Sequence, residues 1–151
     1  MANKPLTQMV PDFREALEEG LEQAVTTVVR DLQKEGPYWT GFFADMWQVN
    51  VGTQAVKPNI SSMEPVGKQP KPERDFVEVF VPESPDLQGY TIGNRANYRL
   101  FAMDILTDPN RGRGASGARL TAPKKWYDRY INAQMPDVIN TQITNVFRRY
   151  K

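Results

Sequence analysis

Apolar residues recur every three or four positions near the start of the chain, which is the spacing of one face of an α-helix. These positions are Phe13, Leu17, Leu21, Ala24, Val25, Val28 and Leu32. Pro11 favours a first helical turn and Gly36-Pro37 favours a stop, so we predict a long amphipathic helix over residues 11–35. Gly20 in its middle is interpreted as facing solvent, with a close crossing by another backbone as the alternative.

Three short segments have the composition of β-strands. Apolar and polar residues alternate over residues 47–51, and β-branched and aromatic residues fill residues 76–81. A further short strand is predicted over residues 89–93, and a single helical turn capped by Thr40 precedes the first strand. The three strands would form a small sheet, with Trp47, Val49 and Val51 in the core.

The rest of the chain divides into loops and helices. A Pro-rich loop covers residues 53–74, and a loop rich in Gly and Arg covers residues 109–119. A helix is predicted over residues 96–106, Pro123 opens another, and Pro136 restarts a last one. Val138, Ile139, Ile143, Val146 and Phe147 share a face of that last helix.

These elements predict an α+β fold, with a small antiparallel β-sheet packed against a long N-terminal helix and C-terminal helices. A chain of 151 residues is of single-domain size, so we expect one domain over residues 1–151. The sequence has no Cys and no His, which excludes disulfides, thiolate zinc sites, cysteine nucleophiles and Ser-His-Asp relays. No apolar run of membrane-spanning length or signal-peptide type is present, so we expect neither insertion nor export.

The net charge of +1 hides an asymmetry along the chain. Residues 1–94 carry 8 basic and 14 acidic side chains, net −6, whereas residues 95–151 carry 11 basic and 4 acidic ones, net +7. A bipolar subunit can pack acidic face to basic face, and such contacts close into rings when the rotation allows. The alternative is that the charges scatter over a mixed surface.

The Gly-rich loop invites interpretation as a phosphate site, but it lacks the Gly-Lys-Ser/Thr ending and no apolar strand leads into it. A contact with phosphate or an acidic partner is the better functional interpretation, and a solvated loop is the alternative. The basic residues in and after this loop are Arg111, Arg113, Arg119, Lys124, Lys125 and Arg129.

Five aromatic residues gather before and at the first strand: Tyr38, Trp39, Phe42, Phe43 and Trp47. Stacking of nucleic-acid bases on them would need basic residues nearby to follow the backbone. No Lys or Arg lies between Lys34 and Lys57, so we interpret the aromatics as core or subunit interface.

Three segments, taken in order, resemble neck or tail-completion proteins of tailed bacteriophages. The first is Thr40-Gly41 followed by Trp47 and a strand ending Val49-Asn50-Val51-Gly52. The second is Tyr90-Thr91-Ile92-Gly93-Asn94-Arg95-Ala96-Asn97-Tyr98. The third is Thr121-Ala122-Pro123 with Trp126, leading into a C-terminal helix. The motif residues of the resemblance are Thr40, Gly41, Trp47, Asn94, Tyr98, Pro123 and Trp126.

The resemblance implies a non-enzymatic virion subunit that needs no cofactor or metal. It would form a homo-oligomeric ring in the head–tail connector, assembled in the host cytoplasm beside other neck, connector and tail proteins. Duplex DNA would slide through a lumen that holds phosphate only weakly. We expect the C-terminal half to meet the neighbours or DNA through Arg111, Arg113, Arg119, Lys124, Lys125, Arg148 and Arg149.

Two other classes of function stay open. A nucleic-acid-binding module would use the basic C-terminal half and bind DNA with a steep salt dependence. A small carboxylate enzyme would need a pocket and a metal ion.

Overall fold

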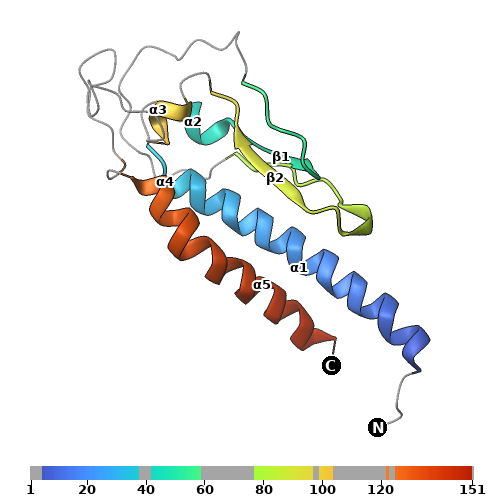
Figure 1. Cartoon of the computed structure of the whole chain (residues 1–151). Helices are drawn as coiled ribbons and strands as arrows, with labels where there is room; N and C mark the ends of the chain where they lie inside the picture. Colours follow the sequence, from blue (N-terminus) through green and yellow to red (C-terminus); the bar gives the residue numbers. More distant parts are fainter. Residues whose placement is uncertain are drawn as a thin grey trace.

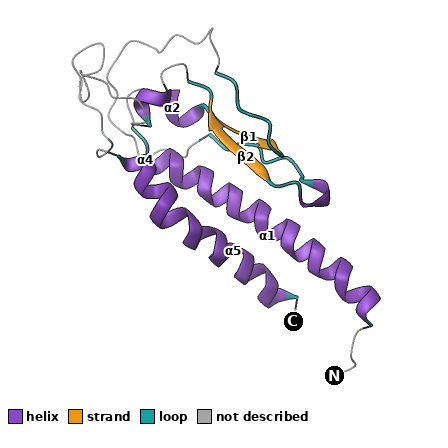
Figure 2. Cartoon of the chain, viewed as in Figure 1, coloured by secondary structure: helices purple, strands orange, loops and turns teal. Residues whose placement is uncertain are grey.

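The computed structural model describes residues 5–37, 42–58, 77–96, 99–103, 122 and 125–150 (Figure 1). Helices and a two-stranded antiparallel sheet make up most of these residues (Figure 2). The predicted α+β class is therefore confirmed. The predicted helical turn before the first strand is α2 (Phe42–Asp45), and the only described helix within the predicted 96–106 span is α3 (Arg99–Ala102).

The first helix, α1 (Leu6–Glu35), begins five residues earlier than the sequence predicts. Pro11 lies inside the helix instead of opening it. Its ring nitrogen has no hydrogen to donate to the carbonyl four residues earlier, but that carbonyl lies in exposed turns where water can replace the bond. The helix ends as predicted at Gly36, whose N–H donates to the Leu32 carbonyl over 3.1 Å.

The C-terminal helices differ from the prediction in being continuous. α4 (Trp126–Arg129) passes into a π-helical turn, η2 (Tyr130–Gln134), and then into α5 (Met135–Arg149). Pro136 therefore does not restart a separate helix. The π turn widens the backbone just before this proline, and the N–H of Met135 reaches back to the Tyr130 carbonyl. That local widening accommodates the missing donor without breaking the helix.

α1 and α5 lie side by side and run in opposite directions (Figure 1). Small residues spaced by four, Ala16, Gly20 and Ala24, are buried on α1. A Cβ built on Gly20 would lie 3.1 Å from the Ile143 Cα of α5. The interpretation of Gly20 as facing solvent is therefore wrong, and the close crossing by another backbone is the observed arrangement.

The sheet consists of β1 (Trp47–Val51) and β2 (Tyr90–Asn94), paired antiparallel with Trp47 opposite Asn94. Both strands match the prediction to within one residue. The predicted third strand over residues 76–81 is wrong for its described part, residues 77–81, which is extended but unpaired. This segment runs along α1, and the Val77 carbonyl accepts a hydrogen bond from the Gln33 side chain of that helix.

The hydrophobic core joins the last turns of α1 to the sheet and to α4. Its larger members are Val25, Val28, Val29, Leu32, Phe43, Trp47, Val49, Met103, Trp126 and Tyr130. Val51, predicted as core, is half-buried at the end of its strand. Phe13, predicted on the buried face of the first helix, is 60% exposed because it lies where α5 ends. Figure 1 shows α1 between α5 and the sheet.

Candidate functional site

The structure describes three motif residues of the resemblance. Two of them, Trp47 and Trp126, lie in an aromatic cluster with Phe43 and Tyr127, and the third, Asn94, lies beside it. The Trp47 and Tyr127 rings stack with centroids 6.5 Å apart, and Phe43 meets Trp126 edge-on at 6.3 Å. Trp47 and Trp126 are each 4% exposed. The interpretation of the aromatics as core is confirmed for Phe43 and Trp47.

Asn94 is a buried polar residue at the end of β2. Its Nδ2 donates to the Phe43 carbonyl over 2.8 Å, and its Oδ1 accepts from the Ala96 N–H over 2.9 Å. A buried amide that satisfies two backbone groups fixes the chain around it. Asn94 therefore holds the end of α2 against the end of the sheet, which is a structural role.

The two tryptophans of the cluster differ in their indole nitrogens. Trp126 Nε1 donates to the Ala102 carbonyl over 2.8 Å, which ties α4 to α3. Trp47 Nε1 is buried and has no hydrogen-bond partner among the described residues. A buried donor without a partner costs about 1–3 kcal/mol, so the cluster carries one unfavourable group.

Tyr130, in the π turn, is almost fully buried against α1. Its hydroxyl donates to Asp31 Oδ2 over 3.1 Å. Burial raises the pKa of Tyr130, and the neighbouring Asp31 charge raises it further, since both disfavour the phenolate. Burial likewise raises the pKa of Tyr127. These tyrosines are neutral packing residues at physiological pH.

Most of the predicted interface residues lie outside the described part of the chain. Those are Arg111, Arg113, Arg119 and Lys124, and the motif residues Thr40, Gly41, Tyr98 and Pro123 lie there too. Lys125 is described, exposed, and placed directly before α4. The predicted charge contact through the Gly-rich loop therefore stays a prediction.

The basic end of α5 is described, and part of it contacts the same subunit. Arg149 Nη2 lies 3.0 Å from Glu19 Oε1 and 3.2 Å from Gln23 Oε1 of α1. The Tyr150 hydroxyl also donates to Glu19, over 3.2 Å. Arg148 is exposed. Of the two predicted arginines, Arg149 thus fastens α5 to α1 and Arg148 faces solvent.

The apolar face of α5 points inward. Val146 is fully buried, Ile143 lies against Gly20, and the Phe147 ring is 5.0 Å from the Phe13 ring. Had the apolar residues of α5 faced solvent beside Arg148 and Arg149, they would have favoured a docking role for this helix. The middle of its exposed side instead carries four neutral polar residues, Asn140, Thr141, Thr144 and Asn145, with exposed Asp137 before them and exposed Arg148 and Arg149 after them.

Exposed apolar side chains gather at two other places. One is the helix-end patch, formed by Met9, Val10 and Phe13 at the start of α1. The other is the extended segment Val77–Val81, where Phe80 is 81% and Val77 is 55% exposed. Sequence reasoning placed Phe13 in the core and Val77–Val81 within a paired strand, so it missed both surfaces.

A cleft of about 430 Å³ separates the extended segment from α1. Its lining consists of Glu22, Thr26, Glu78, Val79, Phe80 and Val81. Arg30 of α1 lies 3.9 Å from Glu78 at the same side of the helix. Within the described ranges, no three acidic side chains converge in a way that could hold a metal ion.

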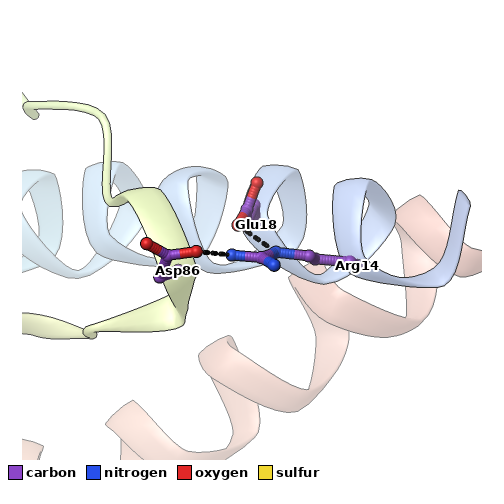
Figure 3. Close-up of polar contacts among 3 residues, drawn as sticks. All are labelled: Arg14, Glu18 and Asp86. Atoms are coloured by element: carbon purple, nitrogen blue, oxygen red, sulfur yellow. Dashed lines mark hydrogen bonds and ion pairs between the residues drawn. The ribbon is translucent and has the colours of Figure 1, made fainter. Parts of the chain in front are cut away.

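The turn after the extended segment is fastened to α1 by charge. Arg14 forms an ion pair with Asp86 and donates through Nε to Glu18 over 3.1 Å (Figure 3). Asp86 and Leu87 both have left-handed φ values, of 60° and 54°. Backbone of this kind persists only when contacts around it hold it in place, and Arg14 supplies one such contact.

None of the described helices is long and apolar enough to cross a lipid bilayer.

This chain was also compared with known proteins. No protein-family model, no curated protein and no solved structure matches this chain.

Proposed function

We propose that this protein is a structural subunit that forms a ring in the head–tail connector of a tailed phage. The observation that carries the proposal is the pair of exposed apolar surfaces, the helix-end patch and the extended segment. The hydrophobic core is formed by other side chains, and the exposed residues Met9, Val10, Val77 and Phe80 of these surfaces are not part of it. Exposed apolar groups that gather in this way mark contacts with other proteins.

The positions of the two surfaces favour a ring over a two-fold dimer. Val10 lies near the start of α1, whereas the cleft beneath Phe80 is lined by Thr26 of the same helix. At 1.5 Å per residue these positions are about 24 Å apart along the helix axis. Two different and separated patches suit a head-to-tail contact, which closes into a ring when the rotation per subunit divides a full turn.

The exposed side of α5 supports passage of DNA through such a ring. The neutral Asn and Thr side chains in the middle of that side release few counterions when they meet phosphate, so they hold duplex DNA weakly. A face of this kind would line a channel without arresting the duplex. The order of motifs given above supplies the placement at the head–tail junction.

The test combines sizing with microscopy. The full chain is purified, its mass in solution is measured over a wide range of concentrations, and the assemblies are imaged by electron microscopy. We expect closed rings whose channel admits duplex DNA, and labelling at the neck when an antibody to the chain is applied to phage particles. A chain that stays monomeric at every concentration and labels no neck would contradict the proposal. Tight, steeply salt-dependent DNA binding would favour the nucleic-acid-binding alternative.

A further inference from the structure

The extended segment Val77–Val81 has the sequence of a strand but lacks the partner of one. Over residues 78–81, Val79 and Val81 are half-buried and pack against the core, while Glu78 and Phe80 are exposed, which is the alternation of a β-strand. Within the described chain, no backbone hydrogen bond joins this segment to β1 or β2. The Val77 carbonyl accepts from the Gln33 side chain, and the remaining backbone N–H and C=O groups of the segment are available to another strand.

The β1 strand offers a matching edge. The Arg95 N–H donates to the Met46 carbonyl over 2.8 Å, and the Gly52 N–H donates to the Gly89 carbonyl over 2.9 Å. These bonds show that the even-numbered residues between Met46 and Gly52 direct their backbone groups toward β2. The backbone groups of the odd-numbered residues 47, 49 and 51 point to the opposite edge, where the described residues supply no backbone partner.

Charge distinguishes the two surfaces. The extended segment and the residues after it carry Glu78 and Glu83, both exposed, and no basic residue over 77–83. The sheet and its flanks, residues 46–58 and 90–96, carry exposed Lys57 and Arg95 and no acidic residue. Opposite charges of this kind set the choice of partner and its orientation more than its affinity.

From these observations we infer that Val77–Val81 of one copy adds as a β-strand to the β1 edge of a second copy. Strand addition of this type gains affinity from main-chain hydrogen bonds and specificity from the side chains on either face. Because each copy offers one segment and one edge, the contact is head-to-tail and can repeat around a ring. The inference rests on the self-association in the proposed function and names the surfaces that produce it.

Engineered cysteines test the contact directly, because the chain has no cysteine of its own. Asn50→Cys on β1 and Glu78→Cys on the segment are prepared as separate full-length proteins, mixed, and oxidised at chain concentrations up to the millimolar range. We expect a two-chain disulfide product that contains one copy of each variant. The matched control pairs Glu78→Cys with Asn140→Cys, which lies on the exposed side of α5. Equal yields from the two mixtures would overturn the inference.

A second pair of variants separates backbone pairing from simple apolar contact. Phe80→Pro removes a backbone donor, whereas Phe80→Ala removes only the ring. We expect proline to abolish association and alanine to weaken it, with the circular dichroism of the free chain unchanged in both. Equal losses from the two substitutions would overturn strand pairing. If Phe80→Pro unfolds the chain, the cysteine mixtures still decide the question.

The outcomes also separate this inference from the proposed function. Closed rings without the Asn50–Glu78 product would refute strand addition and leave the ring standing. The Asn50–Glu78 product in open filaments would support strand addition and contradict the closed ring.

Discussion

The two tryptophans of the aromatic cluster provide a matched pair for a stability experiment. Trp47 and Trp126 are equally buried, but only Trp126 uses its indole N–H, which donates to the Ala102 carbonyl. Substitution of each residue by phenylalanine removes the same atoms from the same cluster. The losses of apolar burial are therefore similar, and the difference between the variants reports on the hydrogen bond.

The expected difference follows from the cost of unpaired buried polar groups, which is about 1–3 kcal/mol each. Trp126→Phe removes the donor and leaves the Ala102 carbonyl without this partner. Trp47→Phe removes a donor that has no partner and so relieves a similar cost. We expect Trp126→Phe to be less stable than Trp47→Phe by about 2 kcal/mol or more. Trp47→Ala, which removes the whole ring, should cost about 3–5 kcal/mol.

The measurement is thermal and urea unfolding followed by circular dichroism at the helical band, because each substitution removes one of the three tryptophans and so changes the fluorescence signal itself. For a domain of this size, about 2 kcal/mol corresponds to a difference in Tm of about 4–8 °C. Equal destabilisation by the two substitutions, or a greater loss from Trp47→Phe, would refute the assignment of Trp47 Nε1 as an unpaired donor.

Three further predictions concern the contact of Gly20 with α5, the buried Tyr130 hydroxyl and the exposed side of α5. Gly20→Val should lower the free energy of unfolding by about 1–3 kcal/mol, because its side chain meets the α5 backbone; an unchanged urea midpoint would contradict that contact. Stability should fall as pH rises above about 10, since the unfolded state then ionises Tyr130 and the folded state does not. Tyr130→Phe removes the contribution of Tyr130 to this pH dependence and also its hydrogen bond to Asp31. A loss of stability with pH that is equally steep in Tyr130→Phe would exclude Tyr130 as the source of the pH dependence. Replacing Asn140 and Thr144 with lysine should strengthen DNA binding in a salt-dependent way, measured by titration at several salt concentrations.

The candidate surfaces could be predicted only in part. The composition of Val77–Val81 indicated a strand, and its extended backbone agrees with that local preference. Whether a strand is paired depends on the neighbour that the fold brings beside it, and no local pattern specifies that neighbour. The same limit applies to Arg149, whose position at a helix end predicted a docking cation while its partner Glu19 is 130 positions away.

Local sequence determined which segments are helical or extended, because a periodicity of 3.6 or 2 encodes which side of a segment is apolar. That code predicts the long helix and β1, and the pair Gly36-Pro37 predicts where the helix stops. The tertiary structure decided which faces meet. Gly20 is buried because α5 crosses it, and Phe13 is exposed because α5 ends beside it. Both outcomes depend on residues more than 100 positions away, whose approach is governed by packing of the whole chain.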